Sequence, residues 1–384
     1  MRVLVTGIST INSIGTNVNE FWSNLLLGRS GITEYVKYGV KTKYAIIDGF
    51  EKYIAPGYKD LGRATSLLLT SIEDAMYSSG LDFDEVEPQR IGISIGTTMG
   101  ELGNHEDIVF GSPLNENKIE RPYTLTNKVA SYLDISGPIW TITNACAAGN
   151  YAIARAYEEI QSGRADIMIA GGVDAFSLTA YAGFNSLRAI TPELCRPFDQ
   201  NRKGLVLGEG TGILILESEE HFLTRKNGKA LASIAGFGLT SDAFHVTKPD
   251  PKARGAITAM ELALEMAGIA PSDIKYVNSH GTGTPSNDYM EAISLNHVFG
   301  EGIKTSSIKA NIGHTLGAAS AIEAVVCILA LNEMKLPPTI NLLKKDPVLT
   351  ADVITDLQEF SSQYIMSNSY AFGGMNSSLI LEKA

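Results

Sequence analysis

The chain has 384 residues, a formal net charge of −11 and 44% hydrophobic residues, which is enough for a large core in one domain or two fused halves. This acidic balance argues against sequence-independent nucleic-acid binding, which needs a basic stripe. Three cysteines predict neither a disulfide framework nor a zinc site, and they favour a reducing, cytoplasmic setting. Apolar runs stay below the ~18 residues of a membrane span, and residues 1–10 read as a strand rather than a signal peptide.

In the first part of the chain, the apolar pattern alternates between predicted strands and helices. The run Ile91 to Gly96 predicts a strand leading into a glycine turn. Residues 64–79 predict a long amphipathic helix that ends at Gly80. Residues 100–125 are polar and predict a loop. The other expected elements are strands at 2–7, 44–47, 139–143 (buried) and 166–170, helices at 17–27 and 126–133, and a strand hairpin over 205–217.

A similar series of elements begins again near residue 229. Aligning the two alanine-rich helices places Cys146 over His314, and the sequence LILE occurs late in both series. General likeness among α/β units is the alternative explanation. We expect an α/β fold of two similar halves, residues 1–227 with Cys146 and residues 228–384 with His280 and His314, whose equivalent strand ends meet near a pseudo-twofold axis. The second series comprises strands at 231–238, 276–279, 365–369 and 378–382, and helices at 256–267, 291–299 and from about 314 to 332.

Cys146 lies in a turn of small residues, Asn-Ala-Cys-Ala-Ala-Gly, between a predicted strand and a predicted helix. Such a turn exposes a side chain at the carboxyl end of a strand, and the helix N-terminus behind it favours thiolate over thiol. The small neighbours leave room for a substrate. The alternative is an inert, buried structural cysteine, which is common for a free cysteine.

Two of the six histidines lie in glycine-rich turns, His280 in VNSHGTGTP and His314 in SIKANIGHTLGAA. A cysteine and two histidines without zinc spacing indicate covalent catalysis through a thioester. Neutral histidines can donate hydrogen bonds to a developing enolate oxygen. Lys309 either sets the local charge or is a solvated surface residue. The glycine-rich turn around Phe372 either offers backbone N–H groups to an oxyanion or is an ordinary β-bend, and no glycine turn matches a phosphate-binding loop.

The chain contains five motifs: ACAAG (145–149), RPFDQNRKGLVLGEGTG (196–212), VNSHGTGTPSND (277–288), SIKANIGHTLGAA (307–319) and NSYAFGGMN (368–376). In these motifs and in their order, the chain resembles the β-ketoacyl-[acyl-carrier-protein] synthases of the elongating, decarboxylating Cys-His-His type. The resemblance covers essentially the whole chain. It implies the thiolase-like fold, with two similar halves in a five-layered α-β-α-β-α core, and a dimer. The initiating branch of the family uses Cys-His-Asn, which His314 argues against.

The resemblance implies that Cys146 takes an acyl group from a carrier protein or coenzyme A thioester and condenses it with malonyl-carrier protein. His280 and His314 would support decarboxylation and the enolate, with Lys309 supporting the site electrostatically. No further cofactor is implied. Other implied roles are an oxyanion site and gate at Phe372, Gly373 and Gly374; phosphopantetheine and acyl contacts at Thr282, Thr284 and Met99; carrier docking at Lys59, Arg63, Arg202 and Lys203; and a monovalent cation near Asn278, Glu323 and Asn368.

Departures from the family pattern leave the pathway open. Ala371 stands where the gate usually has glycine, Met375 replaces a common threonine, and Asn144 precedes the nucleophile motif where threonine is usual. A type II polyketide or polyene ketosynthase, paired with a chain-length-factor homologue, is an alternative to a primary fatty-acid enzyme. A non-catalytic partner subunit would usually lack the nucleophile that is present here. A thiolase would need a second cysteine near the C-terminal glycine turn, and residues 368–376 contain none.

Overall fold

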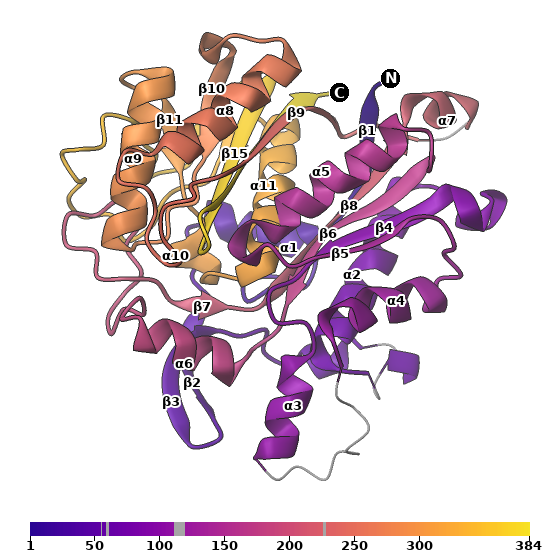
Figure 1. The fold of residues 1–384 in the computed structure, drawn as a ribbon, viewed down its shortest axis with the longest axis horizontal. Coiled ribbons are helices and arrows are strands. Elements are labelled where there is room, and N and C mark those ends of the chain that lie inside the picture. The colour runs from indigo at the N-terminus through magenta and orange to yellow at the C-terminus, as the bar shows by residue number, and fades with distance from the viewer. Residues whose placement is uncertain (55, 59–60, 111–119, 226–227) are drawn as a thin grey trace.

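In the computed structural model of the protein, an 11-stranded mixed sheet runs through the molecule (Figure 1). The structure describes all residues except 55, 59–60, 111–119 and 226–227. The sheet consists of two strand sets that meet where β1 and β9 pair over Leu4–Ser233 and Val5–Ala232. The order is β5 (Ile139–Ile142), β4 (Ile91–Gly96), β6 (Ile167–Asp174), β8 (Gly210–Ser218) and β1 (Val3–Asn12), then β9 (Ala232–Ser241), β16 (Met375–Lys383), β15 (Tyr364–Ala371), β10 (Ile274–Asn278), β11 (Lys304–Ser306) and β13 (Asp352–Val353).

Helices α5 (Ala148–Gln161) and α11 (Ala319–Glu333) pack against each other and against strands of both sets. Helix α2 (Arg63–Ser79) packs on β1 and β8, and α8 (Arg254–Ala267) packs on β9 and β16. This arrangement confirms the expected thiolase-like α/β fold. The remaining elements are α1 (Val18–Leu26), α3 (Leu102–Val109), α4 (Pro122–Tyr132), α6 (Leu178–Ser186), α7 (Glu219–Thr224), α9 (Pro285–Phe299), α10 (Lys309–Ile312), β2 (Ile32–Lys37), β3 (Val40–Ala45), β7 (Leu207–Gly208), β12 (Lys335–Leu336) and β14 (Gln358–Glu359).

Local signals explain several of the correctly predicted boundaries. Asn17 caps α1 by accepting a hydrogen bond from the Glu20 N–H, which satisfies one of the free donors of the first turn. Gly80 ends α2 in the left-handed region at φ 64°, which glycine adopts without cost. The strand predicted at 91–96 has the same bounds in the structure.

Three local predictions are wrong. Residues 205–217 do not form a hairpin, because β7 pairs with β3 while β8 pairs with β1 and β6. Residues 100–125 include α3 and the start of α4, although 111–119 lie outside the described residues. Strand β5 is an edge strand and not a buried one, since Ile139 and Trp140 are 38% and 39% exposed.

The two halves repeat in a register that differs from the predicted one. A 3₁₀ turn precedes α5 at Ala145–Ala147 and precedes α11 at Leu316–Ala318. The first residue of each turn, Ala145 or Leu316, has a left-handed backbone conformation, with φ angles of 48° and 52° respectively. Gly317, and not His314, is therefore the equivalent of Cys146. The LILE sequences do occupy equivalent places in β8 and β16, and the division near residue 228 stays a proposal.

One stretch among the described residues, Leu316–Glu333, is long and apolar enough to match a membrane-spanning helix by length and composition. It is 89% buried inside the protein, as expected for the core helix α11.

Candidate active site

Cys146, His280 and His314 line one pocket. Cys146 comes from the turn before α5, His280 from the loop after β10, and His314 from the segment between α10 and α11. The two imidazole rings are nearly perpendicular, with centroids 5.3 Å apart. All three side chains are buried. The structure thus brings together the nucleophile candidate and both histidines singled out in the sequence.

The backbone of His280 is held by a buried carboxylate that the sequence did not point out. Glu291 on α9 accepts hydrogen bonds from the His280 and Gly281 N–H groups, each at 2.8 Å. Burial raises the pKa of Glu291 to about 8, although these two hydrogen bonds favour its charged form. A Cβ on Gly281 would lie 2.5 Å from Ser307 Cβ, so this turn needs glycine.

The backbone of His314 is held by Val206 and by Gly208 of β7. Its N–H donates to the Val206 carbonyl at 2.7 Å, and its own carbonyl accepts from Gly208 N–H at 3.0 Å. Gly313 precedes it at φ 68°, with its Cβ position 2.7 Å from the Leu207 carbonyl oxygen. This close approach explains the Gly-His pair in the motif.

Hydrogen bonds to Nδ1 set the tautomer of both histidines. The Leu316 N–H donates to His314 Nδ1 at 3.2 Å. Lys309 Nζ lies 3.2 Å from His280 Nδ1, and an ammonium group can only donate. The Ser369 hydroxyl lies 3.3 Å from the same nitrogen and also reaches the Cys146 carbonyl. With Nδ1 accepting, each neutral ring carries its proton on Nε2 and can donate it to a ligand.

Burial keeps both histidines neutral. It lowers the pKa of His280 well below 6.5, with further lowering from Lys309 and then from His314. It lowers the pKa of His314 in the same way, again aided by Lys309. Lys309 is itself buried and forms an ion pair with Glu323, whose pKa burial raises to about 7. The site therefore holds two neutral hydrogen-bond donors beside one buried ion pair.

The structure corrects the expectation of a resting thiolate. Burial raises the pKa of the Cys146 thiol to about 12, and the opposing effect of Lys309 is smaller. The helix behind Cys146 begins only after a 3₁₀ turn, and no side chain caps that turn. The resting group is thus a thiol that loses its proton during reaction.

We expect alkylation of Cys146 by iodoacetamide to accelerate roughly tenfold per pH unit from pH 7 to pH 9, because the thiolate fraction grows tenfold per unit below the pKa. Peptide mass spectrometry after timed labelling measures this rate, with the buried Cys195 and Cys327 as internal controls. A rate that levels off by pH 7.5 would contradict the assignment and restore the thiolate.

The turn that carries Phe372 closes one side of the pocket. Phe372 stacks on Phe184 of α6 with ring centroids 5.3 Å apart, and Phe184 also contacts His314 edge-on. Gly373 and Gly374 have φ angles of 87° and 76°, so the bend lies at these two glycines. Ala371 pairs with Met375 at the end of the β15–β16 ladder and does not share their left-handed conformation.

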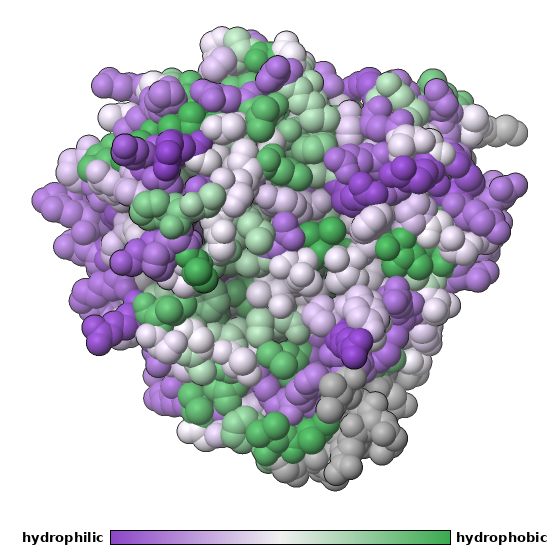
Figure 2. All heavy atoms as spheres, viewed as in Figure 1, coloured by the Kyte–Doolittle hydropathy of each residue, from purple (hydrophilic) through white to green (hydrophobic). Residues whose placement is uncertain are grey.

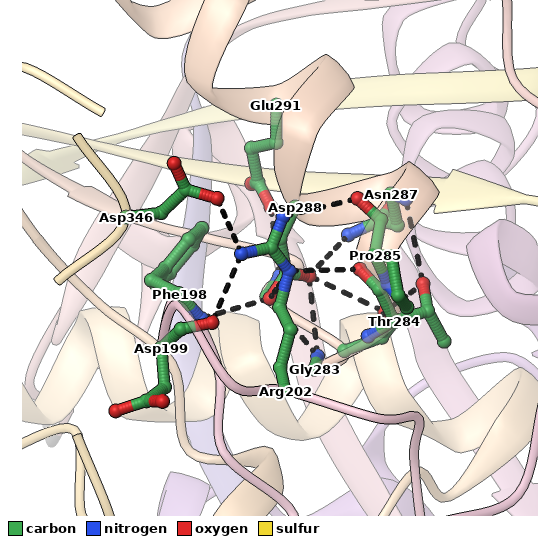
Figure 3. A network of polar contacts seen from close by, with 12 residues as sticks. Phe198, Asp199, Arg202, Gly283, Thr284, Pro285, Asn287, Asp288, Glu291 and Asp346 are labelled. Carbon is green, nitrogen blue, oxygen red and sulfur yellow. Dashed lines mark hydrogen bonds and ion pairs between the residues drawn. The ribbon is translucent and has the colours of Figure 1, made fainter. Parts of the chain in front are cut away.

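Thr282 and Thr284 line the same pocket and belong to a network at the start of α9 (Figure 3). Their hydroxyls are 2.9 Å apart. Asp288, buried on the first turns of α9, accepts hydrogen bonds from the Gly283 N–H and the Phe198 N–H. Burial raises the pKa of Asp288, against the lowering effect of Arg202. The network fixes the loop that carries both threonines.

Arg202 is a part of this network rather than an exposed docking residue. Its side chain is only 7% exposed. The guanidinium donates to the Thr284 and Pro285 carbonyls and pairs with Asp346 and, at 3.7 Å, with Asp288 (Figure 3). The protein already accepts hydrogen bonds from four of the five N–H groups of Arg202, so a docking role for this side chain is less favoured and stays a prediction.

The other predicted docking residues differ in availability. Arg63 pairs with the buried Glu209 and with Glu51, so its charge is largely engaged inside the protein. Lys203 is exposed and paired with Glu193. Lys59 lies outside the described residues. Lys203 thus stays a docking candidate, and Arg63 is a weak one.

Met99 does not line the pocket that contains Cys146. It packs against an apolar cluster that also touches Phe184 and includes Leu205. Its N–H donates to the buried Asp174, which also holds the Thr98 and Gly317 N–H groups. An acyl chain that extends past Phe184 would reach this cluster, so Met99 stays a prediction for the acyl chamber.

Three residues predicted to lie near a monovalent cation each have a buried side-chain oxygen without a hydrogen-bond partner among the described residues. These are Oδ1 of Asn278 and of Asn368, and Oε2 of Glu323. Asn278 pairs in the sheet with Ser367, the neighbour of Asn368. Unpaired oxygens of this kind fit a monovalent cation. No group of three or more His, Cys, Asp or Glu side chains within the described part of the chain could hold a metal ion.

Several residues of the site were missed from the sequence: Asp174, Phe184, Asp288 and Glu291. Asp288 and Glu291 follow the HGTGT turn at i, i+3 spacing, which places them on one helix face beneath that turn. That spacing was a usable signal. The sequence around Phe184 and Asp174 contains no such signal, because their contacts join segments that are far apart in the chain.

A buried cysteine that shares a pocket with two neutral histidines, within a thiolase-like fold, defines a thioester-handling enzyme of the condensing class. Residues 1–221 match the family described as Beta-ketoacyl synthase, N-terminal domain, and residues 231–343 match Beta-ketoacyl synthase, C-terminal domain. The chain belongs to the β-ketoacyl synthase family, whose members are acyltransferase-type condensing enzymes.

Similar proteins span essentially the full chain. A 3-oxoacyl-[acyl-carrier-protein] synthase 2 of Staphylococcus aureus strain MRSA252 is 34% identical and covers 100% of this chain and 98% of its own length. Nodulation protein E of Rhizobium meliloti strain 1021 is also 34% identical, and the match covers 100% of this chain and 99% of that protein. The solved structure of the ishigamide ketosynthase/chain length factor superimposes with a TM-score of 0.92 at 35% sequence identity. The superposition covers 100% of this chain and 99% of that chain. A ketosynthase from Xenorhabdus doucetiae, in complex with its chain length factor, superimposes with a TM-score of 0.91 at 33% sequence identity. The superposition covers 100% of this chain and 98% of that chain.

Proposed function

We propose that the protein is a 3-oxoacyl-[acyl-carrier-protein] synthase in which Cys146 carries the acyl group. The observation that carries this proposal is the shared pocket of Cys146, His280 and His314, with Nδ1 of both histidines occupied by a donor. This arrangement leaves two Nε2–H donors for a substrate oxygen. A nucleophile beside two fixed donors suits the condensation of a thioester with an enolate.

In the first step, a bond forms from Cys146 Sγ to the acyl carbon as the acyl bond to the carrier sulfur breaks. The departing carrier thiol takes up the proton that Cys146 loses. Malonyl-carrier protein then enters, and loss of carbon dioxide leaves an enolate whose oxygen accepts hydrogen bonds from His280 and His314. The enolate carbon attacks the Cys146 thioester, and the bond from the acyl carbon to Sγ breaks as the 3-oxoacyl product leaves. The Cys146 thiolate then takes a proton from water. The backbone N–H groups of Cys146 and Phe372 are proposed to bind the thioester oxyanion.

Lys309 holds His280 in the tautomer that this mechanism needs, by donating to Nδ1. The side-chain oxygens of Asn278, Asn368 and Glu323 that lack a hydrogen-bond partner are proposed as ligands of a monovalent cation. The cation takes no part in the proposed reaction steps, which use only the protein's own residues.

The proposed partner is an acyl carrier protein that docks near the pocket mouth. Figure 2 shows hydrophobic residues gathered in the lower part of the face, around α6, while hydrophilic residues cover α5. Leu187, directly after α6, is exposed, and Arg188 beside it has no ion-pair partner within the described ranges. An apolar patch beside Arg188 and Lys203 suits an acidic helical partner.

We also propose a dimer through the exposed edge of β5, either with a second copy or with a chain-length-factor homologue. An unpaired strand edge with an exposed Trp140 offers both hydrogen-bonding groups and apolar surface. The complexes with chain length factors named above support the second partner. With that partner we propose a polyketide or polyene pathway, and we propose a cytoplasmic setting. Light scattering of the purified chain, alone and co-expressed with such a homologue, tests this, and a monomer under both conditions would refute it.

Intact-mass spectrometry after incubation with acyl-carrier protein tests the proposed function directly. We expect one acyl adduct on the wild-type chain and on the Cys195→Ala and Cys327→Ala variants, and none on Cys146→Ala. The two control cysteines are buried like Cys146 but do not line the pocket. Acylation that persists in Cys146→Ala would overturn the assignment of the nucleophile.

A further inference from the structure

We infer that Lys248 binds the phosphate of the substrate's phosphopantetheine arm at the mouth of the pocket, an inference that rests on the proposed function. Lys248 lines the same pocket as Cys146 and is exposed to solvent. It is the one lysine or arginine that lines this pocket within the described chain. The position was not singled out by any motif in the sequence.

The segment around Lys248 is held in place by hydrogen bonds. The N–H groups of Thr247 and Lys248 both donate to His245 Nδ1, at 3.0 and 3.3 Å. Pro249 follows and restricts Lys248 to an extended backbone. The Val246 carbonyl accepts from the Gly373 N–H at 2.7 Å, which ties the segment to the turn that carries Phe372. The Lys248 backbone is therefore fixed at the pocket mouth while its side chain is free to reach a ligand.

The charge of Lys248 is not neutralised by the protein. No carboxylate lies within 4.0 Å of its ammonium group among the residues that the structure describes. The nearby Asp242 also lines the pocket, but its carboxylate accepts from Asn376 Nδ2 at 2.8 Å and from the Asp250 N–H at 3.0 Å. In a chain of net charge −11, a free cation at this position would attract an anionic ligand.

The start of α9 lines the same pocket as Lys248. Thr284, Ser286 and Asn287 line the pocket there, in the first turn of a helix whose positive dipole end faces this side. Thr284 caps the helix by accepting from the Asn287 N–H. Hydroxyl and amide donors from α9 and the ammonium group of Lys248 thus line one pocket, a combination suited to an anion.

The chemistry of the arm identifies that anion. The arm is a chain of neutral amides that ends in a thiol, and its one formal charge is the phosphate at the end away from the thiol. When the thioester lies at Cys146, the amides pass Thr282 and Thr284 and the phosphate lies toward the mouth. A phosphodiester on a carrier protein and the phosphates of coenzyme A share this chemistry, so the donor used in an experiment can distinguish the two sources.

The test combines a change in the protein with a change in the ligand. Rates of Cys146 acylation are measured by intact mass with four donors that share one acyl group: acyl-pantetheine, acyl-4′-phosphopantetheine, acyl-coenzyme A and acyl-carrier protein. We expect the wild-type chain to prefer the phosphorylated arm over acyl-pantetheine by about tenfold at low salt, the size of one partly exposed charge-assisted contact. Lys248→Ala should remove most of this preference, and Lys248→Arg should keep it. Lys252→Ala, on the same loop but outside the pocket, is the matched control.

Each result of this experiment tests either the role of Lys248 or the proposed function. A preference that is unchanged in Lys248→Ala overturns the inference. A loss seen only with acyl-carrier protein also overturns it, because Lys248 would then contact the carrier surface and not the phosphate. A loss seen with acyl-4′-phosphopantetheine and acyl-coenzyme A as well supports it. If no donor acylates wild-type Cys146, the proposed function fails rather than the role of Lys248.

Discussion

The variants His280→Ala and His314→Ala are each expected to lower the rate of condensation by about 10²- to 10³-fold, the cost of removing one donor to a developing oxyanion. Both rings are neutral at pH 7 because burial lowers their pKa well below 6.5. Both present Nε2–H, since Nδ1 accepts from Lys309 in one ring and from the Leu316 N–H in the other. Acyl transfer to Cys146 uses neither proton in the proposed mechanism, so it should fall far less.

Two readouts separate these steps. Release of carbon dioxide from malonyl-carrier protein measures formation of the enolate, and intact mass measures acylation of Cys146. His297→Ala, on the exposed face of α9, controls for the loss of a histidine away from the pocket. Combining both active-site substitutions should cost less than the product of the single effects, because the two donors serve one oxygen. Full carbon dioxide release by either single variant would contradict the shared role.

The fold was predictable because its signals are local. Helix α2 follows an apolar stripe and a terminal glycine, and β4 is an apolar run before a glycine turn. The edge position of β5 was not predictable, since its sequence reads like that of a buried strand and exposure depends on which strand lies beside it. Helix α6 was missed altogether, because its apolar residues lack a clear helical stripe.

The site was predictable to the extent that its residues lie in recognisable turns. Cys146, His280 and His314 each stand beside glycine or alanine residues that allow close backbone approach, and these small residues are visible in the sequence. What the sequence could not provide is which charges are already paired. Arg202 and Arg63 read as surface cations in the sequence, yet each pairs with a buried carboxylate in the structure, Asp288 and Glu209 respectively. Lys248 has no such partner among the residues that the structure describes, and only the folded chain shows that it lines the pocket.

The buried ion pair of Lys309 and Glu323 should make Lys309→Met strongly destabilising, by about 3–5 kcal/mol in the free energy of unfolding near neutral pH. The substitution leaves Glu323 buried without its counter-ion, and one of its oxygens already lacks a hydrogen-bond partner. The double variant Lys309→Met with Glu323→Gln removes the uncompensated charge, so it should recover much of the loss. Urea unfolding measures all three proteins, with Lys275→Met, exposed on β10, as the control.

The loss in Lys309→Met should also depend on pH in a definite direction. Burial raises the pKa of Glu323 to about 7 even with Lys309 present, and removal of Lys309 raises it further. An unfolded glutamate has a pKa of about 4.3. The folded variant therefore binds the proton more tightly than the unfolded chain, and its stability falls as pH rises from about 4.3 through the folded pKa. We expect Lys309→Met to be markedly more stable at pH 5.5 than at pH 8.5 relative to wild type, and the double variant to lack this dependence. A pH-independent deficit in Lys309→Met would show that lost packing, and not the charge of Glu323, causes the destabilisation.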